Sequence, residues 1–420
     1  MKHRAVILGA GFGGLSAAQH LSRHLRNGDA MDIVLLDKHH LHTYTPLLYE
    51  VVSGGLKHDI STPDLSKGAA MTLGIAGALE DHPSIRMRQE EVADIRLTSK
   101  EIVCRSGVVL QFDQLILALG ALPGTFDIPG VVEHAYTLKH IHDALHIHDA
   151  LHRLVRERAK EPMDVWIIGA GPTGVELAAE LAVSFRSFAR TCPACWSVTL
   201  VDAGPHILST LSSAVALKAM KRLKQLGVRV LQGTLVREVG SSWVVLVPNE
   251  HLSPRVGPLV RDASHRADLV IWTAGVKANE QWRAWGLPVN ERGYVNINDT
   301  FQVIGHGDVW CIGDMAAMEG AVLPQIAPEA IAQGAAVAEN VYRRFRRETS
   351  FRHYRAITWP WAIPLGGRRA IAHYRRLTVN GYLGYLFRKA VDLKYFLDIL
   401  KPMHALRVWW HGARVYLQND

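Results

Sequence analysis

The feature that most constrains the fold is a glycine pattern that the chain carries twice, about 160 residues apart. The first copy reads GAGFGG at 9–14, and the second reads GAGPTG at 169–174. Each copy follows an apolar run typical of a buried parallel strand, at 5–8 and at 165–168, and precedes a helix-like run. A strand, a glycine turn and a helix in this order are the fingerprint of a dinucleotide-binding βαβ unit.

The glycines of each copy have different expected roles. The first allows a tight turn, the second lets the backbone approach a pyrophosphate, and the third lets the helix pack closely on the strand. The helix N-terminus then offers free N–H groups and a positive dipole end to the phosphates. The residues assigned to the two phosphate-binding turns are Gly9, Gly11, Phe12, Gly13 and Gly14, and Gly169, Gly171, Thr173 and Gly174.

An acidic residue follows each glycine motif, at the end of the next apolar strand. Asp37 comes 23 positions after Gly14, and Asp202 comes 28 positions after Gly174. A carboxylate at this place accepts hydrogen bonds from a ribose 2′-OH and repels the 2′-phosphate of NADPH. A single glycine turn also arises for structural reasons, but two complete copies favour two dinucleotides. The economical pair is a flavin and a nicotinamide, so FAD and NADH are the expected cofactors.

Composition agrees with this interpretation. At 420 residues, two or three domains are expected, and the 48% hydrophobic content with 35 glycines suits an α/β protein with buried sheets. Four cysteines in such a chain do not indicate a disulfide framework. The N-terminus runs directly into a strand, so no signal peptide is expected and a cytoplasmic location is favoured.

The positive charge of the chain is concentrated at its C-terminal end. Residues 343–420 carry a net charge of +12, whereas the rest of the chain carries −4. A membrane surface or a nucleic acid could face such a tail, but no nucleic-acid-binding module is visible, so nucleic acid is not expected. No stretch reaches 18 uninterrupted apolar residues, so a membrane-spanning helix is not expected either.

The tail contains two helix-like runs with separate apolar and polar faces. In the run 382–400, one stripe holds Leu386, Ala390, Leu393, Leu397 and Leu400, and Arg388, Lys389 and Asp392 lie off it. After Pro402, tryptophans at 409 and 410 oppose basic residues. This pattern is typical of helices that lie at a membrane interface. A pair of helices docked on the core, or the interface of a homodimer, remains an alternative for 346–420.

Between the two glycine motifs stands the segment YTPLLYEVVSGGL, at 44–56. Together with Asp37 and the second motif, it resembles the type II NADH dehydrogenases, single-chain flavoenzymes of respiratory membranes. Three further segments are similar to that family: LILALG at 115–120, TAGV at 273–276 and VWCIGD at 309–314. The resemblance assigns these further residues to cofactor binding: Lys38, Pro46, Ala118, Gly120, Ala274, Gly275, Gly313, Asp314 and Ala327.

The resemblance implies an α/β fold with two Rossmann-type dinucleotide-binding domains and a C-terminal amphipathic helical module. The FAD domain would comprise 1–120 and 285–345, and the NADH domain would be inserted at 121–284. The implied activity is transfer of a hydride from NADH to FAD and then of two electrons to a quinone, without proton pumping. The implied location is the cytoplasmic face of the inner membrane, with peripheral attachment.

The segment after the Gly313–Asp314 motif departs from the family pattern. It reads APEAIAQG at 327–334, with Ala332 where a glutamine is common. A quinone carbonyl needs a hydrogen-bond donor, which alanine does not supply. Gln325, Pro328 and Gln333 are therefore the candidate quinone residues, and a helix that only packs beside the flavin is an equal alternative.

Glu176 is the candidate catalytic residue, at the start of the helix that follows the second glycine turn. It could orient the nicotinamide or relay a proton, or it could simply complement the helix dipole. Sulfide- or disulfide-type chemistry is a competing activity that would need cysteines beside the flavin, where Cys104 and Cys311 are more simply buried thiols. The pair Cys192 and Cys195 reads as a chance loop pair, a metal half-site or a redox switch. A flavin-binding partner without catalysis is the non-enzymatic alternative, and no metal site is assigned.

Overall fold

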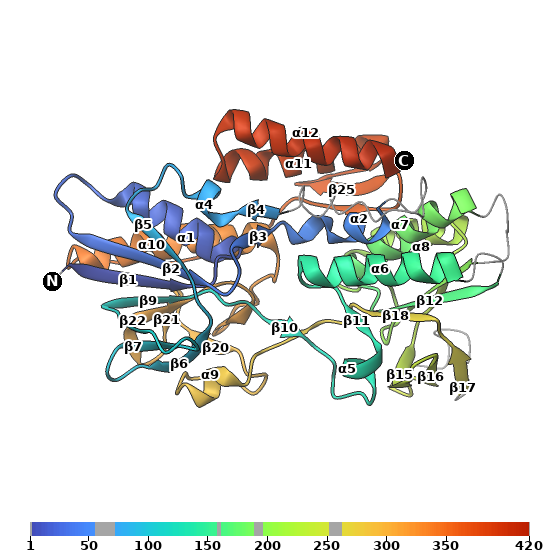
Figure 1. Ribbon diagram of the computed structural model, residues 1–420, viewed down its shortest axis with the longest axis horizontal. Coiled ribbons are helices and arrows are strands. Elements are labelled where there is room, and N and C mark those ends of the chain that lie inside the picture. Colours follow the sequence, from blue (N-terminus) through green and yellow to red (C-terminus); the bar gives the residue numbers. More distant parts are fainter. Residues whose placement is uncertain (1, 55–71, 158–160, 189–195, 252–262, 420) are drawn as a thin grey trace. The chain divides into compact units, whose positions relative to one another are not determined.

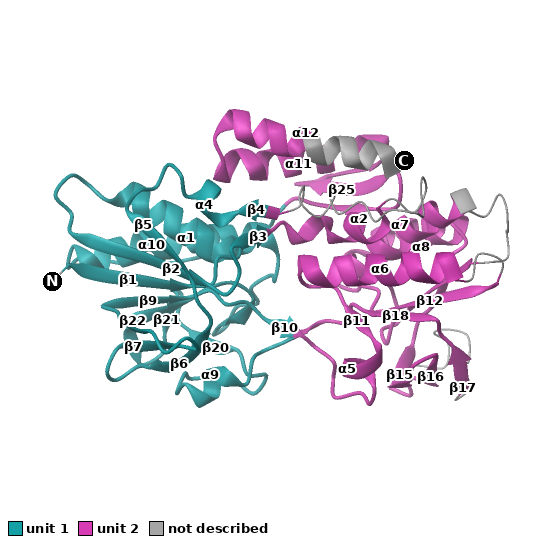
Figure 2. Cartoon of the chain, viewed as in Figure 1, with its two compact units in different colours: residues 1–42, 73–122, 277–359 teal, residues 43–72, 123–276, 360–420 magenta. Residues whose placement is uncertain are grey.

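The structure is a computed structural model that describes residues 2–54, 72–157, 161–188, 196–251 and 263–419, with the backbone alone for 411–419. The chain divides into two compact units (Figure 2). Unit 1 comprises residues 1–42, 73–122 and 277–359, and unit 2 comprises residues 43–72, 123–276 and 360–420. Cys192 and Cys195 lie outside the described residues.

Unit 1 is built on a large sheet whose central strands are parallel (Figure 1). Its strands are β1 (His3–Leu8), β2 (Met31–Asp37), β5 (Ile85–Gln89), β9 (Gln114–Leu117), β20 (Val295–Ile297), β21 (Gln302–Val303), β22 (His306–Cys311) and β23 (Ala316–Met318). Their order is β23-β20-β21-β22-β9-β1-β2-β5. The strands β22, β9, β1, β2 and β5 all run parallel, as the buried apolar runs predict.

Helices cover this sheet, and a small antiparallel sheet adjoins it. The helices are α1 (Phe12–His24), α4 (Ile75–Ala78), α9 (Gln281–Ala284), α10 (Ala327–Phe345) and the 3-10 turn η2 (Gly313–Met315); the small sheet is β6 (Val92–Arg96), β7 (Glu101–Cys104) and β8 (Val109–Gln111). Helix α10 packs directly on α1, because a Cβ on Gly334 would collide with the carbonyl oxygen of Gly13. The hydroxyl of Ser16 also donates to the carbonyl of Ile331 at 2.8 Å.

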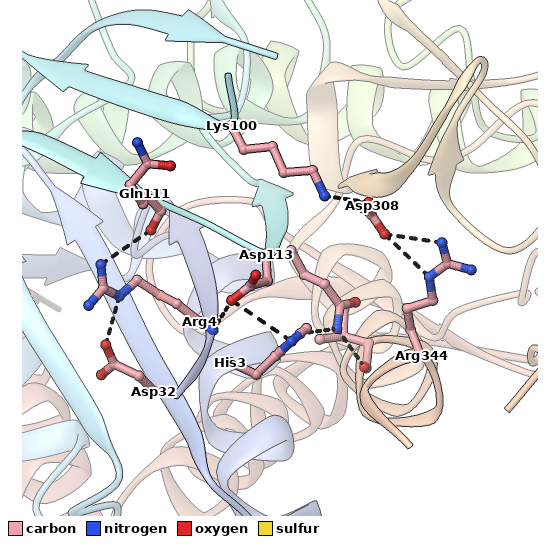
Figure 3. A network of polar contacts seen from close by, with 10 residues as sticks. His3, Arg4, Asp32, Lys100, Gln111, Asp113, Asp308 and Arg344 are labelled. Carbon is pink, nitrogen blue, oxygen red and sulfur yellow. Dashed lines mark hydrogen bonds and ion pairs between the residues drawn. The ribbon is translucent and has the colours of Figure 1, made fainter. Parts of the chain in front are cut away.

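Ion pairs and hydrogen bonds connect β1 with β2, and β22 with α10 and the turn before β7, in unit 1 (Figure 3). Arg4 on β1 lies 2.8 Å from the carboxylate of Asp32 on β2. Lys100, in the turn between β6 and β7, and Arg344 on α10 both contact Asp308 on β22, at 2.7 and 3.2 Å. These ion pairs are partly exposed, so each contributes about 0–1 kcal/mol. They fix how the small sheet and α10 attach, and they lie apart from the glycine turn.

Unit 2 contains a second parallel sheet. Its strands are β11 (Tyr136–Thr137), β12 (Met163–Ile168), β13 (Trp196–Val201), β14 (Arg229–Leu231) and β18 (Leu269–Trp272), in the order β11-β18-β12-β13-β14. An antiparallel sheet follows it: β15 (Thr234–Val239), β16 (Trp243–Pro248) and β17 (Ala263–Arg266). The accompanying helices are α5 (Val131–His134), α6 (Ile141–Glu157), α7 (Pro172–Phe188) and α8 (Ser213–Gln225).

The remainder of unit 2 comes from two distant parts of the chain. These elements are the 3-10 turn η1 (Thr45–Leu47), α2 (Leu48–Ser53), β24 (Trp361–Pro364), β25 (Ala370–Tyr374), β26 (Leu377–Gly381), α11 (Tyr382–Ile399) and α12 (Pro402–Asn419). The short strands β3 (Leu41–Thr43), β4 (Thr72–Gly74), β10 (Leu122–Pro123) and β19 (Val276–Lys277) lie where the chain passes between the units. Within the part of the chain that is described, no helix is both long and apolar enough to cross a membrane.

The predicted fold class is confirmed, since each parallel sheet contains a strand followed by a glycine turn and a helix, and the C-terminal helices are present. The observed division differs from the expected domains in several segments, since 277–284 and 346–359 belong to unit 1. The segment 43–72 and the C-terminal segment 360–420 both belong to unit 2. The reason is packing that no local pattern reveals: α2 packs on α6 and α7, and a Cβ on Gly366, after β24, would collide with the carbonyl of Ala179 on α7.

Candidate functional site

The first glycine turn connects β1 to α1 in unit 1. Gly9 has a φ of +98°, and a Cβ there would collide with the carbonyl oxygen of Ala118. A Cβ on Gly14 would collide with the carbonyl oxygen of Gly9. Gly11 is different, because its φ is −68° and no atom lies within 4 Å of the place where a Cβ would stand. Packing thus requires the outer glycines, whereas the middle one leaves bare backbone facing open space.

The second glycine turn, between β12 and α7 in unit 2, repeats this arrangement. Gly169 has a φ of +103°, and its Cβ would lie 2.6 Å from the Cα of Ala274. The Cβ of a residue at Gly174 would collide with the carbonyl oxygen of Gly169, and Gly171 again has nothing within 4 Å. Open space beside a bare backbone at a helix N-terminus is what a pyrophosphate needs. Both turns therefore fit a dinucleotide.

The two predicted acidic residues hold these turns in the same way. Asp37 accepts a hydrogen bond from the N–H of Ala10 at 2.7 Å, and Asp202 accepts one from the N–H of Ala170 at 2.6 Å. The second oxygen of each carboxylate accepts the backbone N–H two residues further on, at 2.8 and 2.7 Å. Each carboxylate oxygen has two lone pairs, so these bonds leave acceptor capacity for a ribose hydroxyl.

His42 is a residue of the first turn that the sequence analysis missed. Its Nδ1 lies 2.9 Å from the carbonyl oxygen of Ala10, and its ring meets that of Phe12 edge to face at 5.1 Å. A carbonyl only accepts, so Nδ1 carries the proton in this bond. Burial lowers the pKa of His42, which favours the neutral ring. The only sequence signal is its place in the run His39–His42 after Asp37.

The Gly313–Asp314 turn is held from both sides by the two glutamines that the sequence suggested for quinone binding. Gly313, with a φ of +77°, donates its N–H to Oε1 of Gln333 at 2.7 Å. Gln325 donates through Nε2 to the carbonyl of Asp314 at 2.9 Å. Gln333 is buried and Gln325 is exposed. Ala327 and Pro328 form the half-buried first turn of α10.

The remaining predicted residues lie just after strands, in the first turn of α7 or in η1. In unit 1, Ala118 donates its N–H to Leu8 at 2.8 Å, Gly120 has a φ of +70°, and Lys38 directly follows β2. In unit 2, Ala274 and Gly275 follow β18, Thr173 lies in the first turn of α7, and Pro46 lies in η1. Thr273, not assigned from the sequence, places its hydroxyl 2.9 Å from the carbonyl oxygens of both Ile168 and Gly169. It fixes the second glycine turn from the adjacent strand.

A cluster of charged side chains lies beneath α11 in unit 2; we call Glu50, Glu176, Arg388, Lys389 and Asp392 the α11 charge cluster. Arg388 lies 3.3 Å from Asp392 and donates to the carbonyl of Pro46 at 2.8 Å. Lys389 lies 3.6 Å from Glu50.

Two tyrosines complete the cluster. Tyr44 donates its hydroxyl to Asp392 at 2.8 Å, and Tyr49 donates to Glu50 at 2.9 Å. Ions buried in this way are stable only when they are paired and hydrogen-bonded.

Burial changes the proton affinity of the two glutamates in this cluster. It raises the pKa of Glu50 to about 7, although Lys389 and the Tyr49 hydroxyl act in the opposite direction. It raises the pKa of the half-buried Glu176 to about 8, with Arg388 opposing and the carboxylates of Glu50 and Asp392 adding to the rise. Glu176 therefore carries a proton at neutral pH, which is the state that a proton donor requires.

Helix α11 turns its charged face inward, which the sequence analysis did not anticipate. Arg388, Lys389 and Asp392 are 8%, 7% and 1% exposed, whereas Leu386 and Leu397 of the predicted stripe are 45% and 43% exposed. On α12, Arg407 and Trp410 are both exposed, and Trp409 donates to the carbonyl of Lys389 at 3.0 Å. The side chains beyond 410 lie outside the described residues.

The cysteines that the structure describes, Cys104 and Cys311, are both buried. Burial raises the pKa of the Cys311 thiol strongly, so it is not a reactive thiolate. Among the described residues, no group of three or more His, Cys, Asp or Glu side chains is placed to hold a metal ion.

Comparisons with known proteins agree with this geometry. The family model for pyridine nucleotide-disulphide oxidoreductases matches residues 3–334. The type II NADH:quinone oxidoreductase NdhA of Mycobacterium tuberculosis is 26% identical, over 97% of this chain and 86% of its own length. The demethylphylloquinone reductase NdbB of Synechocystis is 27% identical, over 81% and 79%. The resemblance predicted from the motifs is confirmed by these matches.

Solved structures share the fold. NDH2 from Plasmodium falciparum in complex with NADH matches with a TM-score of 0.82 at 19% identity, over 100% of this chain and 98% of its own. The sulfide:quinone oxidoreductase from Aquifex aeolicus matches with a TM-score of 0.77 at 17% identity, over 94% and 90%. At these identities the likeness shows the fold alone.

Proposed function

Since the chain belongs to the pyridine nucleotide-disulphide oxidoreductase family, we propose that it is a type II NADH:quinone oxidoreductase. It takes a hydride from NADH and passes two electrons to a quinone. The observation that carries this proposal is the presence of two glycine turns with the same construction, each with an open middle glycine and an anchored aspartate. The names of its relatives support the same activity.

Each cofactor has its own set of residues. The residues proposed to hold FAD in unit 1 are the turn at 9–14, Asp37, Lys38, Ala118, Gly120, Gly313, Asp314 and Ala327, and Pro46 in η1 is a further proposed cofactor residue. NADH is held in unit 2 by the turn at 169–174, and by Asp202, Ala274 and Gly275. When bound, FAD supplies the hydride acceptor and the electrons for the quinone. The chain supplies orientation and the N–H groups that hold both pyrophosphates.

Glu176 supplies a proton in this proposal. Reduction of a quinone to a quinol by two electrons needs two protons, of which one comes from the hydride of NADH and the other must be supplied separately. The carboxyl of Glu176 holds a proton at neutral pH because burial raises its pKa to about 8. Gln325, Pro328 and Gln333 remain the proposed quinone residues, and the amide of Gln333 also bonds Glu329 and the N–H of Gly313.

The competing acceptors have less support. Sulfide- or disulfide-type chemistry needs an accessible thiolate, and among the described residues the cysteines, Cys104 and Cys311, are buried. The fold alone does not separate these activities, because a sulfide:quinone oxidoreductase matches it. A flavin-binding partner without catalysis would not need a glutamate that retains its proton at neutral pH.

We also propose that the outer face of α11 and the start of α12 bind the membrane surface peripherally, on the cytoplasmic side. Leu383, Met403 and Trp410 are 65%, 81% and 56% exposed. The outer face of α11 combines exposed apolar side chains with the exposed ion pair of Lys394 and Asp398, and a helix at a membrane interface presents both kinds of group. A homodimer that covers this face is the alternative, and sedimentation with anionic vesicles separates the two.

The test of the activity follows the flavin absorbance under anaerobic conditions. NADH should bleach the flavin quickly, and a short-chain quinone should restore the colour. Glu176→Gln should leave the bleaching rate unchanged and slow the recovery by about tenfold or more, since a general acid contributes on the order of 10²-fold. Bleaching without recovery would reject quinone as the acceptor, and no bleaching would reject NADH as the donor.

A further inference from the structure

The first turn of α10 contains a carboxylate whose role the proposed mechanism does not use. Glu329 is fully buried. Its Oε1 accepts hydrogen bonds from the hydroxyl of Tyr354 at 2.8 Å and from Nε2 of Gln333 at 3.1 Å, and its Oε2 accepts one from Nε1 of Trp359 at 2.6 Å. All three of these partners are donors, which suits a carboxylate that only accepts.

These partners come from different places in unit 1. Gln333 lies one turn further along α10, and Tyr354 and Trp359 lie in the segment that follows the helix. A buried carboxylate is usually paired with a cation, but among the described residues Glu329 has neutral donors instead. Three hydrogen-bond donors, one of them Gln333, therefore converge on the carboxylate of Glu329.

The carboxylate determines which way the amide of Gln333 points. An amide has a donor end and an acceptor end, and the donor end faces Glu329. The acceptor end is then presented to the N–H of Gly313, 2.7 Å away. Without Glu329, the amide is free to turn its NH₂ group toward that N–H, where two donors would oppose each other.

Gly313 opens the turn that carries Asp314, and its positive φ of +77° is a conformation that needs support. The N–H of Gly313 is held by Gln333, and Gln333 is oriented by Glu329. A continuous chain of hydrogen bonds thus runs from Tyr354 and Trp359 to the proposed flavin-binding turn.

We propose that Glu329 is a positioning residue for the flavin, which acts through Gln333 to set the Gly313–Asp314 turn. The proposal rests on the proposed function only in taking this turn as a flavin contact. It makes no use of the quinone.

The test measures the dissociation constant of FAD by the recovery of flavin fluorescence when purified holoenzyme is diluted. Glu329→Met, which has no strong acceptor, and Gln333→Ala should each weaken FAD binding by about tenfold, the effect of losing one good hydrogen bond. Because the two residues act in series, the double variant should be no weaker than Gln333→Ala alone. A merely structural role for Glu329 would give independent, multiplying losses.

The matched control is Glu339→Gln, on the same helix. Glu339 pairs with Arg343 and Arg352, at 2.7 and 3.0 Å, and has no bond to the turn. It should leave FAD binding unchanged. Should Glu329→Met not fold, Tyr354→Phe removes one donor, keeps the carboxylate and should give a smaller loss in the same direction.

Three results would overturn the proposal. The first is wild-type FAD affinity in Glu329→Met, and the second is losses that multiply in the double variant. The third is wild-type affinity in Asp314→Asn, which would mean that the turn does not contact the flavin. Failure of the proposed function would give a different result. The wild-type protein would bind FAD without reducing quinone, and the FAD affinities of the variants would still follow the expected pattern.

Discussion

Replacing Glu50 with glutamine should reduce the pH dependence of the protein's stability. Burial raises the pKa of Glu50 from 4.5 to about 7. The folded protein therefore holds this proton more tightly than the unfolded chain does. The associated stability is fully present below pH 4.5 and is lost as pH rises through 7. Between about pH 5.5 and about pH 8, linkage gives a loss of about 2 kcal/mol in the free energy of unfolding. The glutamine of the variant would accept the Tyr49 hydrogen bond but bind no proton.

The assay is urea unfolding of the holoenzyme at these two pH values with excess FAD. The difference between them should be about 2 kcal/mol smaller in Glu50→Gln than in the wild type. Glu339→Gln is the control, because burial there is outweighed by hydrogen bonds from Arg343 and Arg352, which lower the pKa of Glu339. It is therefore ionised throughout this window. An unchanged difference in Glu50→Gln would refute the account of the α11 charge cluster.

Three further substitutions test other parts of the structure. Gly171→Ala should weaken NADH binding about tenfold or more without changing the melting temperature, whereas Gly174→Ala should destabilise the fold, as a thermal melt of both variants would show. Asp202→Asn should raise the ratio of NADPH to NADH turnover, and a constant ratio would reject its assigned role. Lys389→Met should cost about 3 kcal/mol in urea unfolding at pH 8, because it leaves Glu50 buried without its cation; a cost below about 1 kcal/mol would show that the pair is not coupled.

The features that depend on nearby residues could be predicted from the sequence. A strand, a glycine turn and a helix lie within about 20 residues, and the geometry of each glycine is set by its own turn. Because the two strands pair in parallel, the acid at the end of the second strand lies beside the glycine turn, and this pairing is itself a local rule. This is why Asp37 and Asp202 could be assigned, and why Gly9 and Gly14 behave as expected.

The features that depend on distant residues could not be predicted from the sequence. His42 and Thr273 act on the glycine turns through single bonds to backbone carbonyls, for which no motif exists. Gln333 was assigned to the quinone because its side chain can donate, yet its donor faces Glu329. The sequence of a segment indicates which hydrogen-bonding groups are available. The partner that uses each group is fixed only when distant segments meet.

Helix α11 is a further example of a feature that depends on distant residues. Its sequence separates leucines from charges, and that separation is the same whichever face turns inward. Which face of α11 is buried depends on Tyr44, Pro46 and Glu50, which lie more than 300 positions earlier in the sequence. They supply a hydroxyl, a carbonyl and a carboxylate to the helix. These groups cannot be satisfied by leucine, so the charged face is the one that must be buried. Leu386 and Leu397 are then left outside, on the same helix as the exposed pair Lys394 and Asp398, and the need to satisfy polar groups in unit 2 is what creates the surface we assign to the membrane.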